Sequence, residues 1–245
     1  RKPIYGIYGF VRVADEIVDT FFGVDQQRAL DDFELATYQA IKDRYSSNII
    51  LHAFQFVVNT YSIENHLIES FFSSMRSDLS KKKHSSETYD EYVYGSAEVV
   101  GLIWLLFFTK NYKKLYEILL NTAKKLFSSF QKVNFFRDIK EDFFEKGRTY
   151  FPGFEIEKNL NDVQKSNIED EISNEFEEAL KGIYKLPLTS RFGVLLACRY
   201  YKKLFKQLKS TPVEKLFSKR IRVNNFIKAM LVPSTFVLSI FKRSY

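Results

Sequence analysis

Residues 8–19 read Tyr8-Gly9-Phe10-Val11-Arg12-Val13-Ala14-Asp15-Glu16-Ile17-Val18-Asp19. This mainly apolar sequence contains several carboxylates. Asp15 and Asp19 are four residues apart, a spacing that puts two side chains on the same face of a helix. Arg12 joins that face. Two like charges at this spacing repel each other, and they do so more strongly when they are partly buried. The stretch therefore predicts a helix whose polar face is stabilised by a bound cation.

A second stretch repeats the pattern, and it reads Gln131-Lys132-Val133-Asn134-Phe135-Phe136-Arg137-Asp138-Ile139-Lys140-Glu141-Asp142. Asn134, Asp138 and Asp142 follow one another at intervals of four, so all three share a helix face. Oxygen ligands without His or Cys suit Mg²⁺ or Mn²⁺, and Mg²⁺ usually completes its octahedron with water and substrate phosphate. The neighbouring Arg137 would bind phosphate oxygens without competing for the metal. The pattern is that of a diphosphate site.

Two interpretations of these acidic patterns stay open on spacing alone. One Asp-x-x-x-Asp pair on a helix is usually a solvated face and indicates no function. Two copies, each among apolar residues and each with an arginine at a nearby helical position, favour a two-sided site for metal and diphosphate.

Composition narrows the class of protein. The chain has 245 residues, 45% of them apolar, which is enough for one large domain with a substantial core. The formal charge of +7 suits nucleic acid, an anionic membrane or a phosphorylated substrate. Basic residues are mixed with acidic ones, and no zinc finger, RNP motif or helix-turn-helix signature is present, which argues against nucleic acid. A soluble enzyme with anionic ligands fits best.

The chain is predicted to be all-helical. It has only five prolines and nine glycines, and apolar residues recur at intervals of three and four. We expect helices over residues 4–22, 27–45, 48–59, 63–79, 86–109, 112–145, 163–186, 188–208 and 213–241. The last of these is expected to break at Pro233. The simplest architecture is a single-domain helical bundle over residues 1–245 around one central apolar cavity.

The expected location is the cytoplasm. The longest apolar run, residues 99–108, is shorter than the ~20 residues that a membrane span needs. Cys198 is the only cysteine, so no intramolecular disulfide forms. No signal peptide precedes the first helix. The chain opens at Arg1 without an initiator methionine, so we expect that a short N-terminal segment is missing.

Both acidic stretches resemble the signatures of a known enzyme family. Residues 8–19, together with residues 134–142 and the following residues 147–152, are similar to the two motifs of the phytoene/squalene synthase family, and most of all to its bacterial phytoene synthases. The resemblance covers nearly the whole chain in the expected order, because further segments resemble the central helices and the basic C-terminal segment of the family. These are residues 75–79, 92–101 and 220–223.

The resemblance implies a class I isoprenoid synthase fold, in which facing aspartate-rich helices bind several Mg²⁺ ions that hold diphosphate. Metal ligands carried over from the family are Asp15, Asp19, Asn134, Asp138 and Asp142. Of these the four aspartates, with Tyr94, are also the expected catalytic residues. Diphosphate contacts carried over are Arg12, Arg137 and Arg222, and residues expected to border the reacting carbons are Tyr8, Tyr94 and Gln131.

The reaction implied by the resemblance is head-to-head condensation of two geranylgeranyl diphosphates to 15-cis-phytoene in carotenoid biosynthesis. Mg²⁺, for which Mn²⁺ is a possible substitute, and arginine would stabilise the departing diphosphate, and the resulting allylic cation would be attacked to give a cyclopropylcarbinyl diphosphate. No NADPH is expected. The alternative is a squalene or dehydrosqualene synthase that uses farnesyl diphosphate. A noncatalytic assembly-factor relative is disfavoured, because such a protein would be expected to lose the aspartates.

Three features remain outside this interpretation. Glu98 stands where many relatives have Gly, and the family's Ser-rich phosphate-binding segment before the first motif is absent. The apolar C-terminal sequence is flanked by the basic residues Lys228, Lys242 and Arg243. This pattern predicts reversible association with the inner face of an anionic membrane. The alternative is a C-terminal helix that only packs on the bundle. The sequence does not indicate the oligomeric state.

Overall fold

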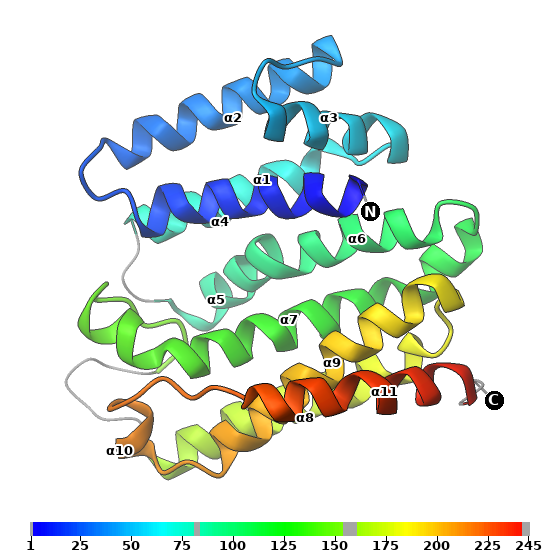
Figure 1. Cartoon of the computed structure of the whole chain (residues 1–245). Helices are drawn as coiled ribbons and strands as arrows, with labels where there is room; N and C mark the ends of the chain where they lie inside the picture. The colour runs from blue at the N-terminus through cyan, green and yellow to red at the C-terminus, as the bar shows by residue number, and fades with distance from the viewer. Residues whose placement is uncertain (1, 81–83, 154–160, 242–245) are drawn as a thin grey trace. The chain divides into compact units, whose positions relative to one another are not determined.

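The computed structural model describes residues 2–80, 84–153 and 161–241, and within them it confirms the all-helical fold (Figure 1). The chain divides into two compact units, which we call the N-terminal unit (residues 1–81) and the C-terminal unit (residues 82–245). Each unit is described by itself below. The single domain expected over residues 1–245 stays a prediction.

The N-terminal unit consists of four helices, α1 (Lys2–Asp19), α2 (Gln26–Asp43), α3 (Ile49–Tyr61) and α4 (Asn65–Ser80). Two helix starts are set by side chains that accept backbone hydrogen bonds: Asp25 accepts from the Arg28 N–H, and Asn48 from the N–H groups of Ile50 and Leu51. Helix α1 packs against each of the other three helices. The helix that carries the first acidic motif is thus the centre of this unit.

An aromatic cluster around Phe10 determines which face of α1 is buried. The Phe10 ring stacks on Phe54 of α3 with 3.8 Å between centroids, and it also contacts Phe33, Phe71 and Phe72. Such pairs add stability beyond the apolar area that they bury. Because this face turns inward, Arg12 lies exposed, while the side chains of Asp15 and Asp19 are only partly exposed.

The C-terminal unit is built around one long helix, α7 (Lys113–Phe144), which packs against α6, the short helix η1, α8 and α9. Figure 1 shows α7 running between the α5–α6 pair and the helices α8, α9 and α11. The other elements are α5 (Ser86–Val93), η1 (Tyr94–Glu98), α6 (Val99–Thr109), α8 (Asp162–Ile183), α9 (Leu188–Lys209), α10 (Val213–Leu216) and α11 (Asn225–Phe241).

Two predicted helices differ from the structure. Residues 86–109 are interrupted by η1, a turn of π-helix in which the Val99 N–H donates to the Tyr94 carbonyl oxygen. The predicted break at Pro233 is wrong, because the chain leaves the helix after Leu216, resumes it at Asn225, and continues through Pro233.

Side-chain hydrogen bonds follow Pro233 inside α11. Proline removes one backbone donor from a helix. The hydroxyls of Ser234 and Thr235 donate to the carbonyl oxygens of Met230 and Leu231, at 3.0 and 2.6 Å. Neither bond reaches the Ala229 carbonyl oxygen, four residues before Pro233, which is the acceptor that loses its backbone donor.

One stretch, Ser86–Thr109, is long and apolar enough to cross a membrane when only its length and composition are considered. Of its most apolar window of 18 residues, 56% is buried within the protein, as is typical of a core helix. It contains Glu98 and packs through η1 and α6 against α7.

Candidate active site

The first acidic cluster lies in the N-terminal unit and joins α1 to α4. The pKa of Asp15 is raised from 3.8 to about 7, first by burial and then by repulsion from Asp19 and Asp78, while Arg12 opposes the shift. Arg12 itself forms an ion pair with Glu16 on the next turn of α1. The ionised form of Asp15 is therefore poorly compensated. A hard divalent cation would stabilise it, so the donor chemistry fits Mg²⁺.

Asp78 is a functional candidate that the sequence interpretation missed. It lies on α4 and is buried, with 8% of its surface exposed. Phe71 and Met75 precede it at intervals of seven and three, and both are buried core residues. A carboxylate at a position that continues the apolar face of a helix was the available signal.

The second acidic cluster lies on α7 in the C-terminal unit. Asp138 is held by two arginines, with 2.8 Å from its Oδ1 to the Nε of Arg137 and 2.8 Å to the Nε of Arg220. Asp142 pairs with Lys146 at 3.5 Å. Asn134 accepts a hydrogen bond from the Tyr201 hydroxyl at 3.3 Å. The face predicted from the spacing is therefore surrounded by basic and hydroxyl groups.

The basic C-terminal segment, residues 220–223, reaches this cluster through Arg220. Lys140 donates to the Ser218 carbonyl oxygen at 3.1 Å, which anchors the segment beside α7. Arg220 then contacts Asp138, and it lies 3.8 Å from Glu141. Arg222, the predicted diphosphate ligand, is exposed. The structure thus identifies Arg220 as the arginine of this segment that contacts the acidic motif.

The residues expected near the reacting carbons occupy three different settings. Tyr8 is 62% exposed on α1, and Gln131 is half-buried on α7, three residues before Asn134. Tyr94 begins η1, and the Lys124 Nζ lies 5.0 Å from its ring centroid. Burial and Glu98 together raise the pKa of Tyr94. Their catalytic roles stay predictions.

Metal ligation by these residues likewise stays a prediction. Across residues 2–80, 84–153 and 161–241, no group of three carboxylate, His or Cys side chains has the geometry of a metal site. Mg²⁺ is often held by only one or two carboxylates, with water and substrate phosphate as the remaining ligands.

A small apolar cavity of about 30 Å³ lies between α6 and α7 in the C-terminal unit. Its walls include Gly101, Trp104, Phe108 and Phe127. These residues carry no charge, so the cavity is apolar, and its volume is far below the range of about 300–1,000 Å³ that is typical of ligand sites.

Comparison with solved structures defines the fold class. A dehydrosqualene synthase in complex with a ligand superimposes with a TM-score of 0.78 at 21% identity, covering 95% of this chain and 84% of that one. A squalene synthase from Alicyclobacillus acidocaldarius gives a TM-score of 0.72 at 19% identity, covering 84% of this chain and 82% of the other. The chain thus has the all-helical fold of these synthases.

Sequence comparison then places the chain in a family. The sequence model of squalene/phytoene synthase matches residues 1–226, and the chain belongs to the squalene/phytoene synthase family. The family consists of head-to-head prenyltransferases.

Similar curated proteins include two plant enzymes. Phytoene synthase 1, chloroplastic, of Arabidopsis thaliana is 26% identical over all of this chain and 61% of its own length. The chloroplastic phytoene synthase of Daucus carota is also 26% identical, over 65% of its length. The chain thus spans about three fifths of the length of these relatives. Placement among bacterial phytoene synthases stays a prediction.

Proposed function

We propose that this protein is a Mg²⁺-dependent prenyltransferase that joins two prenyl diphosphates head to head. The observation that carries the proposal is the environment of Asp15, a largely buried carboxylate that is repelled by Asp19 and Asp78 and opposed only by Arg12. Such a group is costly unless a cation binds it. In a chain of this family, a cation with its substrate diphosphate is the ligand that explains the cost.

The two acidic clusters would hold Mg²⁺ through Asp15 and Asp19 on α1 and through Asn134, Asp138 and Asp142 on α7. Bound Mg²⁺ would neutralise charge on the departing diphosphate. Mn²⁺ is the expected substitute, since it accepts the same oxygen ligands.

Basic side chains beside the second cluster would bind the diphosphate itself. Arg137 and Arg220 both contact Asp138, and Lys146 contacts Asp142. Guanidinium groups bind phosphate oxygens through paired hydrogen bonds, and they keep their charge at all relevant pH values. We propose Arg220, in addition to the predicted Arg12, Arg137 and Arg222, as a diphosphate ligand.

Apolar side chains would exclude water from the allylic cation. We propose that the cavity lined by Gly101, Trp104, Phe108 and Phe127 is the closed end of a channel for one prenyl tail. Its floor would then set the length of the tail, because a longer chain needs more depth before it meets the rings.

Geranylgeranyl diphosphate is the substrate that we propose, with 15-cis-phytoene as the product and carotenoid biosynthesis as the pathway. The plant phytoene synthases among the relatives support this choice. The similarity of fold to a dehydrosqualene synthase supports farnesyl diphosphate as the alternative substrate. No NADPH is required for phytoene.

The test is mass-resolved product analysis after separate incubation with each prenyl diphosphate and Mg²⁺. The proposal expects a C40 product from geranylgeranyl diphosphate and a smaller yield of C30 product from farnesyl diphosphate. A higher kcat/KM for farnesyl diphosphate would contradict the phytoene assignment, and absence of diphosphate release from both would contradict the prenyltransferase. A shift of the product to squalene when NADPH is added would indicate the reductive alternative.

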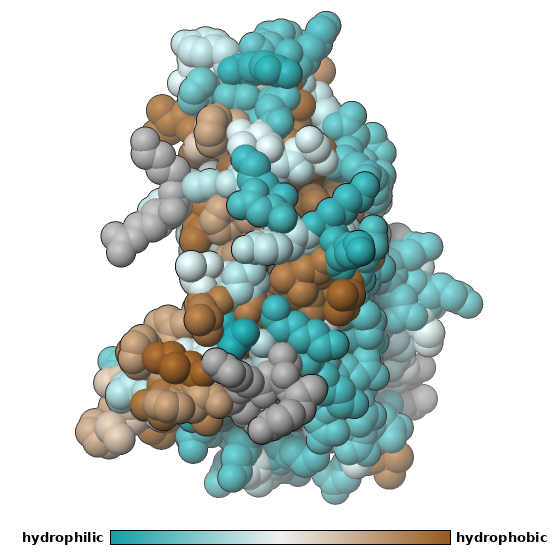
Figure 2. Space-filling model, turned by 90° about the vertical axis from the view of Figure 1, so that its right-hand side faces the viewer, coloured by the Kyte–Doolittle hydropathy of each residue, from teal (hydrophilic) through white to brown (hydrophobic). Residues whose placement is uncertain are grey.

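We also propose that the protein works in the cytoplasm and attaches reversibly to the inner face of the membrane, where its hydrocarbon product would partition. Figure 2 shows apolar residues gathered over α11, at the lower left. Phe226, Phe236, Val237 and Phe241 are each more than half exposed there. Lys228 lies on the same helix, whereas Lys242 and Arg243 lie outside the described residues. An apolar helix face with nearby positive charge suits an anionic bilayer surface.

A further inference from the structure

A polar cavity of about 490 Å³ lies within the C-terminal unit, between α5 and η1 on one side and α7 and α8 on the other. This volume is within the range of small-molecule sites in proteins, which is about 300–1,000 Å³. None of the residues carried over from the family motifs lines it except Tyr94. Apart from Tyr94, the residues of its walls have no role in the proposed head-to-head condensation.

The charge of the walls is opposite to the charge of the chain. Five carboxylates line the cavity, those of Asp90, Glu98, Glu171, Glu175 and Glu178, against the two ammonium groups of Lys125 and Lys132. The formal balance is therefore two minus five, or −3, in a chain of net charge +7. Prenyl diphosphates are anions and would be repelled by these walls. The charge favours a cationic ligand.

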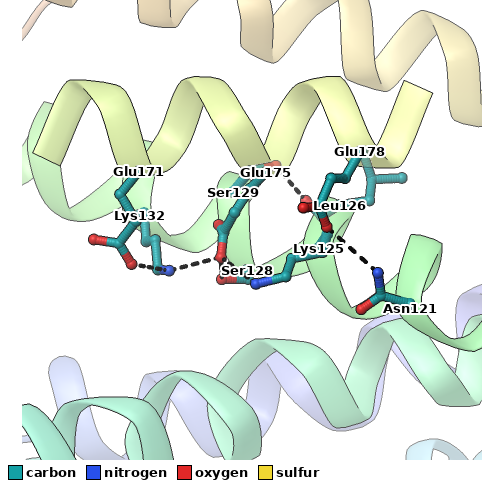
Figure 3. Close-up of polar contacts among 9 residues, drawn as sticks. All are labelled: Asn121, Lys125, Leu126, Ser128, Ser129, Lys132, Glu171, Glu175 and Glu178. Atoms are coloured by element: carbon teal, nitrogen blue, oxygen red, sulfur yellow. Dashed lines mark hydrogen bonds and ion pairs between the residues drawn. The ribbon is translucent and has the colours of Figure 1, made fainter. Parts of the chain in front are cut away.

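The two lysines are both engaged by α8. Figure 3 shows Lys132 reaching from α7 toward Glu171 and Glu175, and its Nζ lies 2.8 Å from Glu175. The Lys125 Nζ lies 3.4 Å from Glu175, which also accepts a hydrogen bond from the Ser128 hydroxyl at 2.9 Å. These contacts compensate the negative charge of Glu171 and Glu175.

The other three wall carboxylates, those of Asp90, Glu98 and Glu178, have no ion-pair partner among the described residues. Burial raises the pKa of Glu98, and the attraction of Lys124 and Lys125 only opposes this shift. A cation bound in the cavity would lower the cost of keeping Glu98 ionised.

The backbone at Glu98 also indicates a built site. Tyr94 and Glu98 begin and end the π-helical turn η1, and both line the cavity. Single π-turns inside helices are rare and occur frequently at functional sites. The turn places an aromatic ring and a carboxylate on the same wall. Because the Lys124 Nζ already lies 5.0 Å from the Tyr94 ring centroid, the carboxylate of Glu98 is the group that the turn offers to a ligand.

A buried hydroxyl close to the same carboxylates also lacks a partner. Tyr89 of α5 is 3% exposed, and its hydroxyl has no hydrogen-bond partner among the described residues. Burial raises the pKa of Tyr89 well above its usual value, and the charges that add to the shift are Glu171, Glu175 and Asp90, all of them wall residues. The Lys132 Nζ, which lines the cavity, lies 5.7 Å from the Tyr89 ring centroid. A buried polar atom without a partner is uncommon, although Tyr89 itself does not line the cavity.

We propose that this cavity binds a small organic cation with two or more ammonium groups, a di- or polyamine, through the carboxylates of Asp90, Glu98 and Glu178. The wall carboxylates do not have metal-ligand geometry among the described residues, and they come from three different helices. An extended amine with separated charges spans such groups better than a single ion does. The proposal concerns binding alone and does not depend on the prenyltransferase activity.

The experiment is isothermal titration of the full chain with spermidine, in buffers of equal ionic strength. The expected result is saturable binding to one site. Glu98→Gln and Glu178→Gln should each weaken binding at least about tenfold, because each removes a charge-assisted contact. Lys125→Gln should tighten binding, since it makes the cavity more negative. Glu177→Gln is the matched control, because Glu177 lies on α8 next to Glu178, is exposed, and does not line the cavity.

Three outcomes would overturn the proposal. The first is a lack of saturable binding by a folded wild-type chain. The second is equal loss of affinity in Glu177→Gln and Glu98→Gln, which would indicate attraction to the acidic surface of α8 in general. The third is displacement of spermidine by MgCl₂ far beyond that by NaCl at the same ionic strength, which would indicate a divalent-cation site. Circular dichroism checks each fold, and Asp90→Asn replaces any variant that does not fold.

Discussion

Gly101 of α6 lies directly against the ring of Phe127 of α7. A Cβ built on Gly101 would lie 2.7 Å from Cδ2 of Phe127 and 3.0 Å from the Ala123 carbonyl oxygen. Real Cβ atoms do not approach other atoms this closely, so only glycine lets the two helices pack at this distance. The Phe127 ring also lines the small apolar cavity, so this contact connects the stability of the C-terminal unit with the proposed tail channel.

Gly101→Ala is expected to destabilise the protein by about 1–3 kcal/mol, because the added methyl group forces α6 and α7 apart. Denaturant unfolding followed by circular dichroism measures the change. Gly193→Ala is the control, since a Cβ at Gly193 of α9 would meet nothing within 4 Å. That substitution should stabilise the helix by about 0.5–1 kcal/mol. Equal effects of the two substitutions would contradict the close packing at Gly101.

Phe127→Leu is expected to deepen the apolar cavity and to favour the longer substrate. One methylene of fit in an apolar pocket changes discrimination by about 1–3 kcal/mol. The ratio of kcat/KM for geranylgeranyl diphosphate to that for farnesyl diphosphate should therefore rise about tenfold. An unchanged ratio with intact activity would show that another wall sets the tail length.

Asp15→Asn and Asp138→Asn are each expected to lower turnover by orders of magnitude, because they remove charge where the metal and the diphosphate bind. The measurement is diphosphate release at saturating Mg²⁺. Asp32→Asn is the control, since Asp32 of α2 is exposed and forms only a long ion pair with Arg28, at 3.8 Å. Near-normal turnover in both site variants would refute the metal assignment.

The stability of the protein without added metal should fall as the pH rises from about 4 to about 7. The pKa of Asp15 is raised to about 7 in the folded state, so between these pH values the folded state binds the extra proton and the unfolded state does not. Asp15→Asn should remove this contribution and raise the melting temperature at pH 8. Added Mg²⁺ should stabilise the wild type at pH 8 more than the variant. If Asp15→Asn leaves the dependence of stability on pH unchanged, the raised pKa of Asp15 is contradicted.

Lys132→Met is expected to destabilise the protein by about 3–5 kcal/mol, since it leaves a buried carboxylate with less compensation. The side chains of Lys132 and Glu175 are only 5% and 6% exposed, and they lie 2.8 Å apart. Lys181→Met, at an exposed position of α8, is the control and should change stability by less than about 0.5 kcal/mol. Adding Glu175→Leu to Lys132→Met should restore part of the loss. Equal stability of the Lys132 and Lys181 variants would argue against a buried ion pair.

Replacement of Val237 and Phe241 by Ser is expected to reduce co-sedimentation with anionic phospholipid vesicles. These side chains are 52% and 78% exposed on α11, and burial of apolar surface contributes to binding at a bilayer. Leu35→Ser is the control, since Leu35 is 71% exposed on α2, a different helix. Binding of the wild type should weaken as salt is raised. If the wild type does not co-sediment even at low salt, α11 has no role in membrane attachment.

Local patterns predicted much of the second acidic cluster. Asn134, Asp138 and Asp142 share a face because α7 is a regular helix there, and the four-residue spacing is enough to show it. The break near the C-terminus was harder to predict. Pro233 is the strongest local signal for a helix end, yet α11 continues through it. The actual gap after Leu216 contains no glycine or proline.

The sequence by itself determined that the chain is helical and which acidic residues share a helix face, because both follow from spacing within about one turn. Only the tertiary structure decided that Asp78 of α4 lies close enough to Asp15 of α1 to raise its pKa, and that Arg220 contacts Asp138. The partners in the second pair are more than eighty positions apart, and their meeting depends on how an irregular segment is anchored to α7. Such contacts arise from the packing of whole elements, and no local periodicity encodes them.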